Sequence, residues 1–370
     1  MALSADVDAL DARVTDEFAR VFGSDAVADI AAHGEEKLAR WLDRVLTESS
    51  SADDDDDAKE ARERVVDVTY AALKTHGAWP RESWRDAYVL AQLRRCAAAL
   101  RDRDDDGETR AESAREAMLA VDMAVIVGAP VDMVFDFVRA CEGALGVDGR
   151  REASAGRARS APSSEWSFPS AAPTGDRGDH AAQMRLARVH HREMDLKTFK
   201  QRYYKTETPV FIESLGEEWP ALRKWADLTW WRWLHGHRSV PLEIGKYSDV
   251  EKWREEVKTI AEFIDEDMLP SVRGVSTGDV AYLAQHQLVD QLRELAEDYT
   301  VPEYVGAGNC ALSFERVYIW MGTAGTITPC HFDTYDNLFG QVRALNDTYF
   351  FPLSLRESNR SRSVKVMTAR

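Results

Sequence analysis

The sequence predicts an α+β protein with a helical N-terminal domain, a linker, and a C-terminal domain built around a β-sheet. Three observations support this fold class. Apolar residues recur three or four positions apart over residues 1–147, as they do on the buried face of a helix. Residues 148–179 are dominated by Arg, Ser, Ala, Pro and Gly. After His180, short apolar runs are bounded by turn residues, which is typical of strands.

The N-terminal domain is expected to consist of helices whose apolar faces form one core. Ser4 is a suitable N-cap for the first helix, and Gly23 is a suitable residue to end it. Ser83 followed by Asp86 resembles a capping box at the start of another helix. The apolar stripes place the helices at residues 4–23, 38–46, 65–73, 83–100, 112–127 and 131–145. Three methionines are expected to fill the core, namely Met118, Met123 and Met133.

Residues 148–179 are expected to form a disordered linker. Their composition cannot bury enough apolar surface to offset the entropy that is lost when a chain becomes ordered. Their arginines also suggest a weak localisation signal or an anion-binding patch, although a solvated tether is the simpler interpretation.

The C-terminal domain is expected to cover residues 180–342. Strands are predicted at residues 209–212, 240–244, 317–320 and 339–342, and helices at residues 259–268 and 288–297. Five tryptophans lie between the first two strands, and they are Trp219, Trp225, Trp230, Trp231 and Trp233. Such a group is expected to pack around the base of a barrel, and a base-stacking surface is the less favoured alternative.

The composition indicates a protein that binds neither nucleic acid nor membrane. A net charge of −17 disfavours direct contact with phosphate groups, and no apolar run approaches the length of a membrane span. The four cysteines have no paired spacing, so neither a disulfide framework nor a zinc knuckle is expected. The first residues lack the pattern of a signal peptide, and a reducing cytosol or nucleus is therefore the expected location.

The motif with the most chemical information is His331-Phe332-Asp333. An imidazole and a carboxylate on alternate residues of a strand point to the same side, where one metal ion can bind both. These are two of the three ligands in the 2-His-1-carboxylate triad of non-haem Fe(II) oxygenases. No residue after Asp333 is a histidine, so the third ligand of the triad does not follow this motif.

Several runs together resemble the Jumonji-C oxygenases, which belong to the cupin superfamily. The likeness is to the subfamily called Jumonji domain-containing protein five, which is studied as a lysine demethylase and as an arginyl hydroxylase. In the helical region it rests on residues 78–80 (AWP), 84–88 (WRDAY) and 121–129 (VDMAVIVGA). In the C-terminal domain it rests on residues 240–245 (VPLEIG), 281–288 (AYLAQHQL), Trp320, Gly322, Gly325, Thr326 and 331–337 (HFDTYDN).

The resemblance implies a double-stranded β-helix barrel that binds Fe(II) and the cosubstrate 2-oxoglutarate. Carried over residue by residue, it makes His331 and Asp333 the iron ligands. The residues implied to bind 2-oxoglutarate, or to orient the ligands, are Tyr282, Thr328 and Asn337. Trp320 is implied to form a wall of the substrate pocket.

The family reaction decarboxylates 2-oxoglutarate oxidatively and hydroxylates a protein side chain, and hydroxylation of an N-methyl group releases formaldehyde. The implied partner is therefore a protein that presents an arginine or a methyl-lysine side chain, such as a histone or another nuclear protein. The resemblance favours the nucleus over the cytoplasm. The sequence does not decide between hydroxylation and demethylation.

The chain departs from the family pattern after Val342. The family lysine that pairs with the cosubstrate is replaced by Asn346, and residues 343–370 do not resemble the family. The barrel is therefore expected to be incomplete, with unpaired edges at strands 317–320 and 339–342. A truncated or mis-spliced gene model is the simplest explanation, and the alternatives are a genuine shortened isoform and, less favoured, a partner that completes the barrel.

This departure leaves two functions open. An impaired oxygenase is one interpretation, because the second ligand histidine and the cosubstrate lysine are absent. The alternative is a non-catalytic binding or regulatory protein that acts through its helices. Of the remaining histidines, His286 is expected to be a structural hydrogen-bonding residue rather than a replacement ligand. Four others are expected to precede the sheet and lie at the surface, namely His190, His191, His235 and His237.

Overall fold

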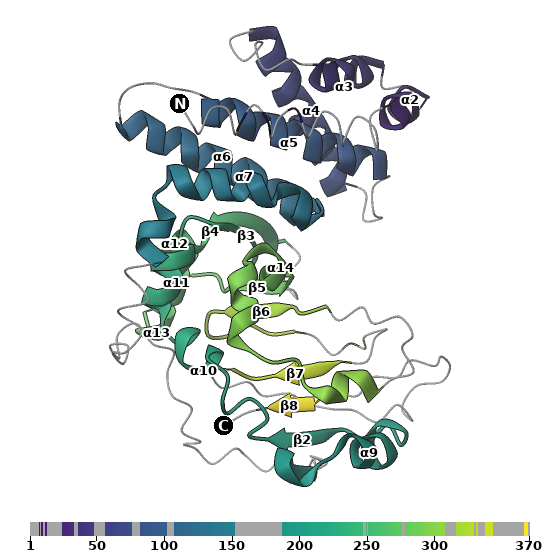
Figure 1. Ribbon diagram of the computed structural model, residues 1–370, viewed down its shortest axis with the longest axis vertical. Helices are drawn as coiled ribbons and strands as arrows, with labels where there is room; N and C mark the ends of the chain where they lie inside the picture. The colour runs from purple at the N-terminus through teal and green to yellow at the C-terminus, as the bar shows by residue number, and fades with distance from the viewer. Residues whose placement is uncertain are drawn as a thin grey trace. The chain divides into compact units, whose positions relative to one another are not determined.

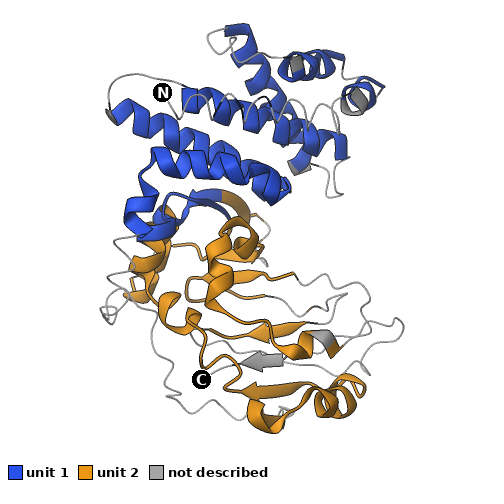
Figure 2. Cartoon of the chain, viewed as in Figure 1, with its two compact units in different colours: residues 1–157, 233–241, 257–261 blue, residues 158–232, 242–256, 262–370 orange. Residues whose placement is uncertain are grey.

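The computed structural model confirms the α+β fold class. It describes residues 24–32, 36–47, 56–75, 82–101, 107–151, 187–246, 249, 251–275, 278–307, 316–328, 331, 337–342 and 366–368, together with residues 7, 9 and 12. The chain divides into two compact units (Figure 2). Unit 1 comprises residues 1–157, 233–241 and 257–261, and unit 2 comprises residues 158–232, 242–256 and 262–370.

Unit 1 is mainly helical (Figure 1). Its long helices are α2 (Ser24–Ala32), α3 (Glu36–Thr47), α4 (Asp56–Thr75), α5 (Glu82–Arg101), α6 (Gly107–Val127) and α7 (Val131–Ala144). The core of the unit draws buried side chains from all of these helices, and α5 supplies the largest share of them. Met118 is fully buried and Met123 and Met133 pack against the same core, as predicted.

The start of α5 differs from the expected capping box. The helix begins at Glu82, so Ser83 lies inside it, and the Ser83 hydroxyl donates to the carboxylate of Asp29 at 2.6 Å. The nearest partner of Asp86 is Arg85, at 3.1 Å. The prediction of a cap was wrong because a tertiary partner on α2 takes the hydroxyl.

The structure describes the two ends of the N-terminal region only in part. Most of the helix predicted at residues 4–23 lies outside the described residues. Residues 147–151 are helical, beyond the expected linker start at residue 148, and Arg151 donates to Glu142 at 2.8 Å. The rest of the predicted linker, residues 152–179, also lies outside the described residues.

Two histidines of unit 1 do not lie at the surface, which corrects the prediction for them: His235 is buried and His237 is half-buried. His235 is 1% exposed, and the His237 side chain lies 3.5 Å from the carboxylate of Glu142. The neighbouring Arg238 pairs with Asp122 on α6 at 2.7 Å. The segment 233–241 therefore packs with the helical core although it is distant in sequence, and local sequence gives no sign of that contact.

Unit 2 contains a sheet whose described strand pairs are all parallel, in the order β1-β2-β8-β7. The strands are β1 (Ala187–His190), β2 (Val210–Glu213), β7 (Leu338–Gly340) and β8 (Val366–Thr368). Strand β8 comes from the predicted atypical tail, and its backbone pairs with both β2 and β7. The edge expected to be open at residues 339–342 is thus partly paired; the rest of the tail lies outside the described residues.

The second sheet has the order β4-β3-β5-β6 and includes the strands that position the candidate site (Figure 1). The strands are β3 (Ser239–Ile244), β4 (Arg254–Thr259), β5 (Ala281–His286) and β6 (Ile319–Gly322). Strand β5 runs antiparallel to both β3 and β6. Alternate residues on these strands, such as Leu242, Ile244, Leu283 and Ile319, are buried, which leaves the intervening residues on the other face.

Short helical segments connect the strands. They are η3 (His191–Glu193), α9 (Leu196–Phe199), η4 (Lys200–Tyr204), α10 (Ala221–Lys224), α11 (Leu228–His235), α12 (Ile260–Glu262), η5 (Phe263–Met268), α13 (Leu269–Val272), α14 (Leu288–Gln291), η6 (Arg293–Asp298) and η7 (Glu303–Ala307). The tryptophans expected to pack together do so around Trp231, which is fully buried and lies 5.9 Å from Trp225 and 5.1 Å from Trp230 between ring centroids. Trp233 differs from the expectation, because it is 40% exposed. None of the described helices is long and apolar enough to cross a membrane.

Candidate functional site

A row of side chains crosses three strands of the second sheet on one face. Glu243 on β3 pairs in register with Tyr282 on β5, and Tyr282 pairs with Gly322 on β6. Directly opposed residues of neighbouring antiparallel strands place their side chains on the same face. Trp320 precedes Gly322 by two residues and therefore belongs to this face, where it is 45% exposed.

Gly322 lets the Tyr282 ring lie against the backbone of β6. A Cβ atom at residue 322 would lie 2.7 Å from Cδ2 of Tyr282 and 2.8 Å from Cγ2 of Thr326, closer than such atoms approach in folded proteins. Gly325, with a φ of 90°, then turns the chain that leads to Thr328. The two glycines of the motif therefore have physical roles in packing and in the turn.

The structure brings together two residues predicted to bind the cosubstrate. The Tyr282 side chain is half-buried on β5 and is hydrogen-bonded to the hydroxyl of Thr328. Burial raises the pKa of the Tyr282 hydroxyl, the Thr328 hydrogen bond opposes that rise, and the carboxylate of Glu243 adds to it. Tyr282 is consequently a neutral hydrogen-bonding group at neutral pH.

Glu243 is a site residue that the sequence did not single out. Burial raises the pKa of its carboxyl, and the nearby Glu255 carboxylate adds to the rise. The sequence signal for Glu243 is that it lies between two apolar residues, Leu242 and Ile244, which are buried. Side chains alternate between the two faces of a strand, so Glu243 lies on the opposite face. Only the strand register reveals that this face also holds Tyr282.

The predicted metal motif is described only in part. His331 is exposed, and Asp333 lies outside the described residues. Asn337 is half-buried immediately before β7, which belongs to the other sheet. The two donors that this motif supplies, an imidazole and a carboxylate, are one short of a facial triad, and no histidine follows them in the sequence. Their fit to Fe(II) is thus partial.

Comparison with known proteins identifies related sequences for the part of the chain that contains these residues. Residues 196–354 match the cupin-like domain family. The chain is 34% identical over 164 residues to lysine-specific demethylase JMJ30 of Arabidopsis thaliana, covering 44% of this chain and 37% of that protein. It is 35% identical over 148 residues to lysine-specific demethylase 8 of Xenopus tropicalis, covering 40% and 32%. It is 33% identical over 155 residues to Jumonji C domain-containing protein 5 of Drosophila melanogaster, covering 40% and 37%.

Residues 196–354 form a JmjC-type cupin domain. The predicted family and fold class are thereby confirmed. The JmjC cupin domain contains every site residue predicted from the sequence, from Tyr282 to Asn337. It also continues beyond residue 342, into the segment expected to be atypical. The chain spans less than half of the length of these curated relatives.

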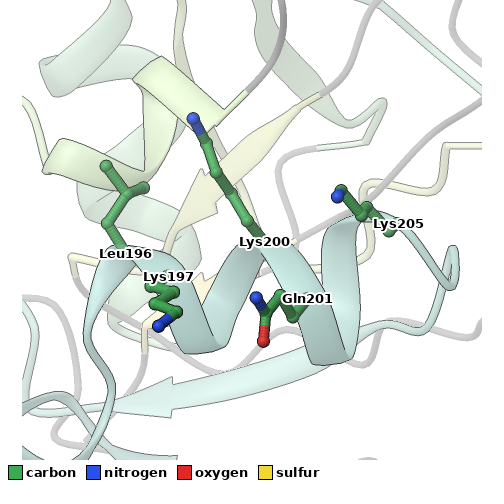
Figure 3. Close-up of a pocket in the computed structure, with 5 residues that line it drawn as sticks. All are labelled: Leu196, Lys197, Lys200, Gln201 and Lys205. Carbon is green, nitrogen blue, oxygen red and sulfur yellow. The ribbon is translucent and has the colours of Figure 1, made fainter.

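A separate hollow of about 380 Å³ lies along α9 and η4 (Figure 3). It is lined by Leu196, Lys197, Lys200, Gln201 and Lys205, and Figure 3 shows the side chains of Lys197 and Lys200 pointing in different directions. These residues come from one helical segment and include none of the predicted site residues. The hollow is therefore distinct from the face that holds Tyr282 and Thr328.

Proposed function

We propose that the JmjC cupin domain binds 2-oxoglutarate through Tyr282 and Thr328 and belongs to an Fe(II)-dependent protein hydroxylase or demethylase. The observation that supports this most directly is the hydrogen bond between these two side chains. Each hydroxyl has one O–H donor, so once the bond between them is broken both can donate to one carboxylate, and neither competes with it for a metal ion. Asn337, with one amide donor group, is proposed to assist in binding the cosubstrate or in orienting a metal ligand.

His331 and Asp333 are proposed to hold the metal ion. Bound Fe(II), together with 2-oxoglutarate and oxygen, would supply the oxidising chemistry, while the protein supplies ligands and orientation. Because the second histidine ligand of the triad is missing, we propose that residues 1–370 alone hold the metal weakly and turn over little or no cosubstrate. The position of the family lysine is Asn346, which removes a charge-assisted contact worth about 1.5–3 kcal/mol.

The substrate is proposed to be a protein with a basic side chain. Glu243 provides a half-buried carboxyl beside Tyr282, and Trp320 provides an exposed aromatic ring on the same face. A guanidinium or methylated ammonium group is recognised by both kinds of partner, through charge and through contact with the ring. The names of two relatives specify lysine demethylation, which supports a methyl-lysine substrate. A histone or other nuclear protein, and a nuclear location, are proposed from the family resemblance alone.

A second candidate is a non-catalytic binding protein. The incomplete donor set favours it, and so does a helical unit with a large core of its own. In this case unit 1 would make the functional contacts, and the JmjC cupin domain would bind ligands without converting them.

Turnover of 2-oxoglutarate distinguishes the oxygenase from the non-catalytic binding protein. Purified residues 1–370 are incubated with Fe(II), ascorbate and 2-oxoglutarate, and succinate is quantified beside a His331→Ala variant. We expect the two to form succinate at the same rate. Succinate clearly above the variant would contradict the proposed impairment and would establish an active oxygenase that draws a third ligand from elsewhere.

Substrate recognition is tested separately with peptides that contain arginine, lysine or trimethyl-lysine in an otherwise constant sequence. We expect the basic peptides to bind the protein, and Glu243→Gln to weaken that binding. Glu255→Gln is the matched control, because Glu255 is a neighbouring acid on the adjoining strand β4. Equal weakening by both substitutions would indicate a general acidic surface rather than a role for Glu243.

A further inference from the structure

Two neighbouring strands bring histidine and glutamate side chains together at one edge of the parallel sheet. Strand β1 ends at His190 and is followed directly by His191. Strand β2 ends at Glu213, which is in register with His190, and the turn that follows contains Glu217. Because paired parallel strands end at the same edge of a sheet, residues that follow them lie close together.

The distances in this cluster suit a metal ion. One ligand atom from each of His190, His191 and Glu217 lies within 4.8 Å of the others. Nε2 of His191 is 3.7 Å from Oε1 of Glu217, and the two imidazole rings have centroids 4.9 Å apart. All three side chains are half-buried, so small side-chain rotations can bring their donors to one ion.

His191 gives an independent indication of a ligand. Its Nε2 atom is buried, and no hydrogen-bond partner for it lies in the part of the chain that the structure describes. A buried polar atom without a partner destabilises the folded state, and coordination to a metal ion would satisfy it. This atom lies toward Glu217, which carries the carboxylate of the cluster.

The other two groups already have partners that a metal ion would replace. Nδ1 of His190 accepts the backbone N–H of Arg192 at 3.2 Å, so coordination by this atom gives up one hydrogen bond. The guanidinium of Arg192 pairs with Glu217 at 2.8 Å, but the Arg192 side chain is 69% exposed and is free to move into solvent. Burial opposes ionisation of Glu217, yet Arg192 and the two histidines hold the pKa of its carboxyl below the ordinary value.

We propose that His190, His191 and Glu217 form a binding site for a divalent transition-metal ion such as Zn²⁺. Two imidazoles and one carboxylate favour borderline ions of this class over Ca²⁺ or Mg²⁺, which prefer oxygen donors alone. A water molecule would complete a tetrahedral site. The ion would link the ends of β1 and β2 and stabilise the start of unit 2. This site uses none of the residues proposed to bind 2-oxoglutarate or Fe(II).

The test measures Zn²⁺ bound by the full chain in a His331→Ala background, which removes the imidazole of the other candidate metal motif. Protein freed of metal by chelation is dialysed against ZnCl₂ and its metal content is measured, and thermal unfolding is followed in parallel. We expect one zinc ion per chain and a higher melting temperature with zinc. Adding His191→Ala or Glu217→Gln should weaken zinc binding about tenfold or more and abolish the shift in melting temperature.

Arg192→Ala distinguishes a metal site from a purely structural ion-pair cluster. If the cluster binds metal, removing Arg192 frees Glu217, and zinc affinity rises several-fold. Unchanged zinc binding by both the His191→Ala and the Glu217→Gln proteins would overturn the proposal. Circular dichroism verifies the fold of each variant. If His191→Ala does not fold, the nearly isosteric Glu217→Gln decides the outcome.

Discussion

The guanidinium of Arg238 lies 2.7 Å from the carboxylate of Asp122, and the two residues are 116 positions apart in the sequence. Nε of Arg238 also donates to Asp122 at 3.0 Å, and the backbone N–H of Ser239 donates at 2.7 Å. Arg238 is 2% exposed and Asp122 is fully buried. This group joins residues 233–241 to helix α6 within unit 1.

Removing Arg238 should destabilise the protein strongly. Arg238→Ala leaves the buried Asp122 carboxylate without its cation, and breaking a buried pair in this way typically costs about 3–5 kcal/mol. Urea unfolding of both proteins measures the change in the free energy of unfolding. Arg232→Ala is the control, because Arg232 pairs with Asp265 on the surface and should lose only about 0–1 kcal/mol. Equal losses would contradict the importance of the buried pair.

The same pair predicts a weaker effect of one substitution in an isolated fragment. Residues 1–147 are predicted to fold alone as a helical domain, and that fragment lacks Arg238. Asp122→Asn should therefore destabilise the full chain, where it breaks the buried pair, and should change the stability of the fragment little. Circular dichroism during thermal unfolding tests both. A fragment without helix, or without a cooperative transition, would contradict an independent domain.

Gly322→Ala should disturb the site through the Tyr282 ring. The added Cβ would meet Cδ2 of Tyr282 at 2.7 Å, and overpacking of this kind costs about 1–3 kcal/mol. Gly143→Ala is the control, since a Cβ at that helical position meets no atom within 4 Å and should stabilise the protein slightly. Thermal unfolding and near-ultraviolet circular dichroism compare the two. A Gly322→Ala protein as stable as wild type would show that the ring is not packed on β6.

Acid should destabilise unit 1 through His235. Burial, followed by the positive charges around it, lowers the pKa of His235 to about 3 in the folded state, whereas an unfolded histidine has a pKa of about 6.5. The unfolded state thus binds more protons between these two values. Stability is fully present above pH of about 6.5 and falls below it by up to about 1.4 kcal/mol per pH unit.

Urea unfolding at pH 7 and pH 5.5 measures this effect. His235→Gln keeps a neutral polar side chain at this position, so its stability should fall less between the two pH values than that of the wild-type protein. An equal fall in both proteins would assign the acid sensitivity to other groups.

The sequence predicted those features that depend on local pattern. Helices α3, α5 and α7 and the strands at residues 209–212 and 240–244 were predicted to within about two residues, because apolar periodicity marks them. Helix α2 was not predicted, and α4 begins at Asp56, well before the predicted residue 65. Strand β8 was missed, since three residues within a polar tail carry no periodic signal. The burial of His235 and the pairing of Arg238 with Asp122 depend on contacts between distant segments.

The residues of the candidate site were likewise predicted only in part from the sequence. The resemblance to a family supplied Tyr282 and Thr328, which the structure brings together, whereas Glu243 required the register of β3 against β5. No local pattern distinguishes Glu243 from an ordinary exposed acid on a strand. The parallel strands β1 and β2 likewise reveal the cluster of His190, His191 and Glu217, which the sequence treats as unrelated.

Binding of 2-oxoglutarate tests the central proposal most directly. The full chain is titrated calorimetrically under anaerobic conditions with Fe(II) present, and is compared with Tyr282→Phe and Thr328→Val. Each substitution removes one hydroxyl donor to a charged ligand, which should weaken binding by about 1.5–3 kcal/mol, or roughly tenfold to a hundredfold. Tyr203→Phe is the control and should bind as wild type does, because Tyr203 packs against the separate core cluster that contains Val210 and Ile212. We expect saturable binding that both site variants weaken; binding that neither variant changes would contradict the proposed roles of Tyr282 and Thr328.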